Sequence, residues 1–93
     1  MKSRTYQTCE RILKNLIQTY GPTARIGELL INLAIKEEAG GDSRTMRHYR
    51  EDLVSLNFLI VNRDATFSFN LKKVDYKQLE LQESLLISDD KPP

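Results

Sequence analysis

The clearest pattern of apolar and polar positions lies over residues 5–20. Apolar side chains recur there three and four residues apart, with polar side chains between them, which is the pattern of a helix that buries one face. Gly21 and Pro22 follow, and both residue types end helices. We therefore expect a first helix over residues 5–20, with one face formed by Cys9, Ile12, Leu13, Leu16, Ile17 and Tyr20.

A second helix is expected over residues 26–38, and it is apolar on more than one side. Such a helix is typical of a position between two other helices. The preceding residues 23–26 are interpreted either as the lead-in to this helix or as a short strand. The main face of the helix is predicted to consist of Ile26, Leu29, Leu30, Leu33 and Ala34, with Ile31 and Ile35 nearby.

A glycine turn separates this helix from a third one, expected over residues 43–57. Gly40 and Gly41 can adopt the left-handed backbone that closes a helix, and Asp42 or Ser43 can cap the next helix by accepting its free N–H groups. Two helices joined in this way match the helix-turn-helix motif. With about 100° per residue, the inward arc consists of Met46, Tyr49, Leu53 and Leu56, the outward arc of Arg44, Arg47, His48, Glu51 and Ser55, and Arg50 lies at the border.

A short β-hairpin is predicted over residues 58–71. Residues 58–61 are all apolar, and residues 66–71 alternate strictly, which is the period of a half-buried strand. The polar residues between the two runs indicate a turn. The face of the second strand that points to the core is expected to carry Phe67, Phe69 and Leu71.

Residues 74–87 are expected to form a last helix, in which Asp75 and Gln78 have the spacing of a capping box. Its apolar surface is wide for a terminal helix, so we interpret it as a candidate dimerisation element. The remaining residues 88–93 are acidic and are expected to be disordered. The chain is thus predicted to be a mainly α protein with a small β-hairpin, an α+β fold, in which residues 1–73 form the single domain.

Composition narrows the classes of function. The net charge is +1, of which residues 1–74 contribute +4 and residues 75–93 contribute −3. The body of the chain is therefore mildly basic, which is compatible with nucleic-acid binding. No apolar run approaches the ~20 residues of a membrane helix, and no signal peptide is recognised at the N-terminus. We expect a cytoplasmic protein without a membrane partner.

Catalytic and metal chemistry find little support in the sequence. Cys9 is the single cysteine and His48 the single histidine, too few for an intramolecular disulfide or a four-ligand zinc site. Cys9 is expected in the core as a small apolar residue. The chain also lacks a nucleophile–base pair and a phosphate-binding glycine loop. We therefore expect no enzymatic activity, no cofactor, no metal and no small-molecule substrate.

The order of helix, helix, glycine turn, basic helix, hairpin and helix resembles the winged helix-turn-helix superfamily of DNA-binding proteins. The resemblance covers residues 5–72, and residues 41–60 are its most telling part. There Leu53, Leu56, Phe58 and Leu59 stand where such domains pass from the recognition helix into the first wing strand, with Asn57 in place of a common glycine. The chain is also similar to small winged-helix regulators of archaea, their viruses and their plasmids.

The resemblance implies that helix 43–57 enters the major groove, which admits one α-helix, and that hairpin 58–71 acts as the wing. Arg44 and Arg47 are expected to contact base edges, because a guanidinium group can bond both O6 and N7 of guanine. The other expected DNA contacts are Ser43 and Thr45 with phosphates, His48 with base or backbone, Arg50 and Arg25 with phosphates, and Arg63 with the minor groove or backbone.

Two questions stay open at the level of the sequence. Glu51 follows Arg47 by one helical turn and either orients that arginine through an ion pair or reads a cytosine amine.

The expected function is that of a sequence-specific regulator of transcription that binds double-stranded DNA. We expect a homodimer, because a monomer with so few basic residues would bind DNA weakly. The alternative is a winged-helix module that binds another protein and not DNA.

Overall fold

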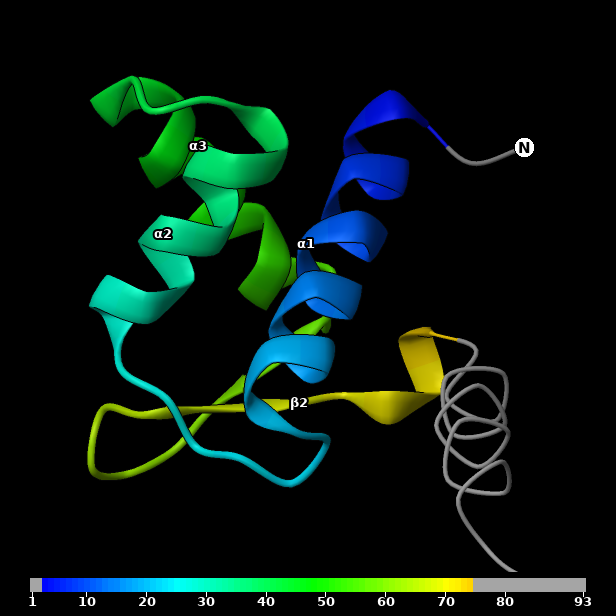
Figure 1. Cartoon of the computed structure of the whole chain (residues 1–93), viewed down its shortest axis with the longest axis vertical. Helices are drawn as coiled ribbons and strands as arrows, with labels where there is room; N and C mark the ends of the chain where they lie inside the picture. Colours follow the sequence, from blue (N-terminus) through cyan, green and yellow to red (C-terminus); the bar gives the residue numbers. More distant parts are fainter. Residues whose placement is uncertain (1–2, 75–93) are drawn as a thin grey trace, which may run out of the picture.

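The computed structural model describes residues 3–74 (Figure 1). Its first helix, α1 (Arg4–Tyr20), begins one residue before the predicted range 5–20 and ends where predicted. Ser3 caps it, because its Oγ accepts a hydrogen bond of 3.1 Å from the Tyr6 amide. Gly21 ends it with φ of 96°, a conformation that favours glycine. The predicted buried face is confirmed for five of its members, Cys9, Ile12, Leu13, Leu16 and Ile17, while Tyr20 is 37% exposed.

The second helix, α2 (Glu28–Ala39), begins two residues later than predicted and buries a different face. Ile31, Ala34 and Ile35 are buried, whereas Leu29 and Leu33 are 79% and 52% exposed. The predicted face is therefore wrong at both leucines. The predicted set began with Ile26, which lies outside the helix. Because α2 is apolar on both sides, its spacing alone does not select the side of Ile31, Ala34 and Ile35 as the inner one. This correction moves the outer surface of α2 to Leu29 and Leu33.

The third helix, α3 (Ser43–Ser55), is followed by a short antiparallel hairpin of β1 (Leu59–Val61) and β2 (Phe67–Phe69). Leu59 pairs with Phe69 and Val61 with Phe67. The chain reaches β1 through Asn57, which has φ of 65°, so asparagine takes the left-handed position as expected. The hairpin prediction is confirmed, with strands shorter than the apolar runs suggested.

The segment between α1 and α2 contains an extended residue that joins the hairpin. Ile26 forms an antiparallel bridge with Phe67: each amide donates to the other residue's carbonyl, at 3.0 Å and 2.8 Å. Of the two interpretations of residues 23–26, the extended one therefore holds. Figure 1 shows this linker running beside β2, below the helices.

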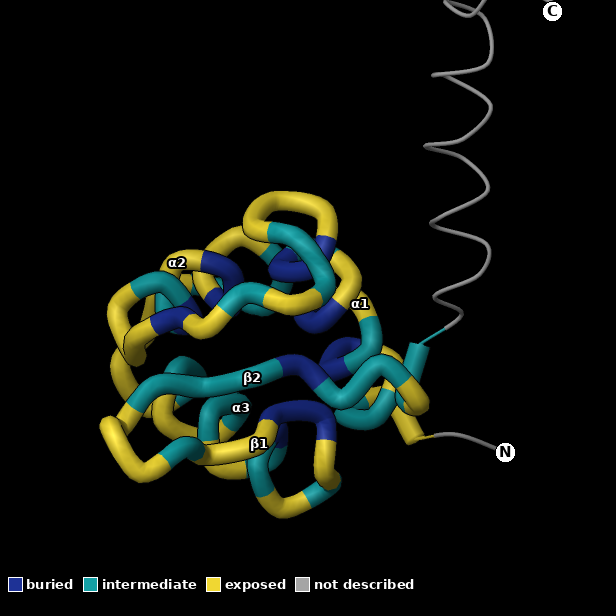
Figure 2. The backbone as a smooth tube through the Cα atoms, turned by 90° about the horizontal axis from the view of Figure 1, so that it is seen from below, coloured by how far each residue is buried: buried dark blue, intermediate teal, exposed yellow. Residues whose placement is uncertain are grey.

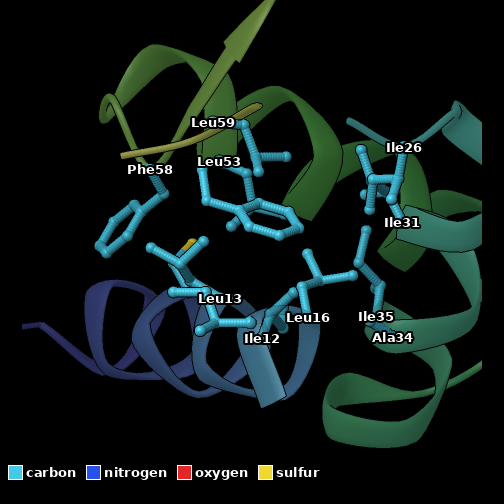
Figure 3. Packing of buried hydrophobic residues seen from close by; sticks show 13 residues of the cluster. Ile12, Leu13, Leu16, Ile26, Ile31, Ala34, Ile35, Leu53, Phe58 and Leu59 are labelled. Carbon is cyan, nitrogen blue, oxygen red and sulfur yellow. The ribbon is translucent and has the colours of Figure 1, made fainter. Parts of the chain in front are cut away.

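The core lies where the buried faces of all these elements meet (Figures 2 and 3). Ile12, Leu13 and Leu16 of α1 lie in one cluster with Leu53 of α3, Phe58 at the start of the hairpin and Ile35 of α2, and Leu16 lies on the Ile35 side of it (Figure 3). The Tyr6 ring packs edge-on against Phe58, with centroids 4.9 Å apart. A final 3-10 turn, η1 (Leu71–Lys73), brings the Lys73 ammonium 5.7 Å from the Tyr6 ring. Figure 2 shows the buried stretches of chain facing inward from helices and hairpin alike.

Residues 3–74 thus form an α+β fold of three helices and a two-stranded antiparallel sheet, in agreement with the predicted class. The predicted last helix, the candidate dimerisation element over residues 74–87, and the acidic tail over 88–93 lie outside the described residues, apart from Val74.

Candidate nucleic-acid interface

The turn before α3 sets the position of the basic helix. Gly40 closes α2 with φ of 118°, and its amide donates to the carbonyls of Ile35 and Lys36. Asp42 then caps α3, because its Oδ2 accepts a hydrogen bond of 3.3 Å from the Thr45 amide. The expected glycine closure is confirmed, and of the two expected caps, Asp42 and Ser43, the structure uses Asp42. Ser43 is therefore the first, exposed residue of α3, and Thr45 lies half-buried in its first turn.

The rotation of α3 about its axis agrees with the prediction. Leu53 is fully buried, and Met46 and Tyr49 are half-buried on the same side. The opposite side is exposed to solvent and carries Arg44, Arg47, His48, Glu51 and Ser55. The helix therefore presents a polar and mainly basic surface away from the core.

Arg50 is used differently from the other two arginines of α3. Its Nε lies 3.0 Å from Oε1 of Glu28, and its Nη1 donates to Oδ1 of Asn32 at 2.9 Å. These contacts join α3 to the first turns of α2. Within residues 3–74, by contrast, the guanidinium groups of Arg44 and Arg47 form no hydrogen bond or ion pair. Phosphate binding by Arg50 stays a prediction, and such a contact would share its guanidinium with Glu28.

Sequence reasoning missed Glu28 and Asn32 as partners of Arg50. Both are polar residues in a helix that is otherwise apolar along its first two turns, and they are four positions apart, so they share one side. That spacing was the available signal. The spacing of Glu28 and Asn32 points to α3 only when the inner side of α2 is known. The predicted inner side, which included Ile26, placed these two residues away from the core.

His48 is also engaged within α3. Its Nε2 lies 3.0 Å from Oδ2 of Asp52, one turn further along the helix, and its ring packs edge-on with Tyr49 at 5.3 Å. The side chain of His48 is more than half exposed, so its outer edge remains open to solvent.

Arg25 and Arg63 are both exposed and lie near the turn of the hairpin. Hydrogen bonds from the Thr66 hydroxyl and amide lower the pKa of Asp64, and the positive charge of Arg25 adds a smaller contribution in the same direction. Asp64 therefore serves as an ionised acceptor that shapes the turn. Ala65, in the same turn, has φ of 67°.

Two open hollows lie side by side on the surface formed by α2, α3 and the hairpin. The first lies between α2 and α3 and is lined by Asn32, Ser43, Arg44, Met46, Arg47 and Arg50. The second lies between α3 and the hairpin and is lined by Glu28, Arg50, Glu51, Val54, Val61, Ala65 and Phe67. Arg50 borders both hollows. We call this surface, from the start of α2 across α3 to the hairpin, the α3 face.

The described part of the chain offers few groups for metal binding or nucleophilic catalysis. Residues 3–74 contain no group of three or more His, Cys, Asp or Glu side chains placed to hold a metal ion. Cys9 is buried, as predicted, and burial raises the pKa of its thiol to about 11, with a smaller contribution from Asp52. The thiol therefore stays protonated near neutral pH, and a protonated thiol is a poor nucleophile.

A scan against protein-family models and searches of curated proteins and of solved structures found no match to this chain. Within residues 3–74, the helices fall short of the length and apolar character that a membrane crossing requires.

Proposed function

We propose that this chain is a winged helix-turn-helix domain that binds double-stranded DNA sequence-specifically and acts as a regulator of transcription. The observation that carries the proposal is that the arginines of α3 differ in their side-chain contacts. Arg50 is paired with Glu28, whereas Arg44 and Arg47 are exposed and unpaired within residues 3–74, on the side away from the core. Both guanidinium groups are therefore available to an external partner.

The dimensions of α3 suit the major groove, which admits one α-helix. With α3 in the groove, Arg44 and Arg47 in its first two turns would meet base edges, and guanine offers them two acceptors in a suitable geometry. Ser43 at the start of the helix would lie by the phosphates, where the free N–H groups of the first turn favour an anion. Thr45 is a weaker candidate, because it is half-buried and its amide already donates to Asp42.

The hairpin would act as the wing beside this helix. Arg25 and Arg63 place two positive charges by its turn, and the Asp64 carboxylate between them is occupied by Thr66. We propose that this pair contacts the backbone or the adjacent minor groove. The Ile26–Phe67 bridge supports a fixed direction for the wing relative to α2.

We propose a cytoplasmic homodimer as the binding unit, and the small positive charge of one copy is the reason for proposing a dimer. Residues 3–74 hold eleven Lys and Arg against eight Asp and Glu, so one copy can make only a few phosphate contacts, each of which adds affinity. A two-fold dimer doubles them and reads half-sites about one helical turn apart. Residues 74–87 are the segment that we propose for dimerisation.

The test is selection of bound duplexes from a random pool, followed by fluorescence anisotropy with the selected DNA at rising salt. We expect Arg47→Ala to weaken specific binding by about 1–3 kcal/mol while thermal unfolding stays unchanged. The control is Lys14→Ala on α1, which removes an equal exposed charge outside the α3 face and should weaken binding far less. Equal affinity of the Arg47→Ala protein for the selected duplex would remove Arg47 from the interface.

An alternative function, docking on another protein, is favoured by one observation. Leu29 and Leu33 are 79% and 52% exposed and lie one turn apart on the outer side of α2. The salt series separates the two functions, because phosphate contacts release counterions and binding to DNA then falls steeply with salt. Absence of binding to any duplex at low salt would favour the protein partner.

A further inference from the structure

Among residues 3–74, the α3 face carries one acidic side chain that has no side-chain partner. Four other carboxylates lie on or near it, and each has a partner: Glu28 binds Arg50, Asp42 caps α3, Asp52 binds His48, and Asp64 accepts from Thr66. Glu51 is exposed and forms no hydrogen bond or ion pair within residues 3–74. In particular, no ion pair joins it to Arg47, so the interpretation that Glu51 orients Arg47 finds no support.

Glu51 occupies the same line along α3 as Arg44. Two side chains that are seven positions apart in an α-helix differ in direction by only about 20° and in height along the axis by about 10 Å. Arg47 lies between them, one turn before Glu51. Since base pairs of B-DNA are stacked roughly 3.4 Å apart, Arg44 and Glu51 are separated by the height of about three base pairs. A helix lying along the groove would therefore present two cations and then one anion.

A carboxylate in this position discriminates sharply among bases. It can only accept hydrogen bonds, and phosphate oxygens repel it. On the floor of the major groove, guanine offers only acceptors, and thymine a carbonyl and a methyl group. Adenine offers an amine beside the N7 acceptor, which would face a carboxylate oxygen. The exocyclic amine of cytosine is a donor without such a neighbour, and Glu accepts from it.

We propose that Glu51 is a specificity-determining residue, reading a cytosine amine within about three base pairs of the guanine contacted by Arg44. This inference rests on the proposed function. Glu51 also lowers affinity for every sequence that lacks a donor at this position, because its charge is then left against the acceptor-rich groove. The same side chain thus contributes attraction to one base pair and repulsion from the rest.

The experiment is selection from a random duplex pool by the wild-type full chain, by Glu51→Gln and by Glu51→Ala. The matched control is Glu37→Gln, the same change at an exposed residue outside the α3 face. The wild-type and control proteins should enrich cytosine at one position. Glu51→Gln should change that position to adenine, because glutamine bonds both N6 and N7, and leave the other positions unchanged. Glu51→Ala should lose the preference there, about five-fold to 150-fold in relative affinity, and bind random DNA more tightly.

Thermal unfolding of each variant shows that the differences do not come from misfolding. If all four proteins enrich the same base at every position, the inference is wrong even though the proposed function holds. The same conclusion follows if both Glu51 variants only bind all sequences more tightly, since the charge alone would then explain the effect. If the wild-type chain binds no duplex at low salt, the proposed function and this inference both fail.

Discussion

Helices α1 and α2 both pack against the core, yet their sequences indicate this in different ways. In α1 the apolar residues keep to one side and polar residues fill the other, and five of six predicted inner residues are buried. In α2 apolar residues occupy both sides, and two predicted inner residues, Leu29 and Leu33, lie in solvent. A hydrophobic period thus predicts burial well only where the polar residues are segregated as well.

The largest effect is expected when a leucine side chain is removed from the inner face of α1. Leu16→Ala in α1 deletes a fully buried side chain, so the free energy of unfolding should fall by about 2–5 kcal/mol. Urea titration followed by circular dichroism measures it. A loss under 1 kcal/mol would mean that the inner face of α1 is less tightly packed than described.

The next prediction concerns the contact that joins α2 to α3. Arg50→Ala removes an ion pair with Glu28 and a hydrogen bond with Asn32, both partly exposed, and should lower the free energy of unfolding by about 1 kcal/mol. Arg47→Ala, on the same helix, is the matched control and should change it by less than about 0.5 kcal/mol. Equal effects of both variants would show that Arg50 makes no stabilising link.

The smallest expected effect belongs to the outer side of α2. Leu33→Ala should change the free energy of unfolding by less than about 0.5 kcal/mol in the monomer, because the side chain is 52% exposed. Chemical denaturation over a range of protein concentrations checks this. A loss that grows with concentration would show that Leu33 is covered in an assembly, and the contrast between α1 and α2 would then narrow.

Much of the α3 face could be predicted from the sequence, because it follows from local rules. The glycine turn, the Asp42 cap and the position of Leu53 together fix the rotation of α3, and this rotation exposes Arg44 and Arg47. These features depend on neighbours a few residues away, which the sequence displays directly.

The role of Arg50 could not be predicted in the same way, because its partner is 22 positions away along the chain. Glu28 faces Arg50 only because α2 begins at that residue, and α2 begins there because Ile26 is extended and bonded to Phe67. A bridge of one residue has no sequence period. Its effect on the phase of α2 therefore becomes visible only in three dimensions.

That bridge has a consequence for how the chain acquires its structure. Ile26 and Phe67 are 41 positions apart, so their pairing closes a long loop, whereas the turns of each helix form locally and fast. We expect the bridge to close late, after α2 and α3 have met. A polypeptide truncated after Ser55 would leave the Ile26 amide and carbonyl without their partner and remove Phe58 from the interior. We therefore expect the three helices to lose stability without the hairpin, because it supplies both a buried ring and the partner of Ile26.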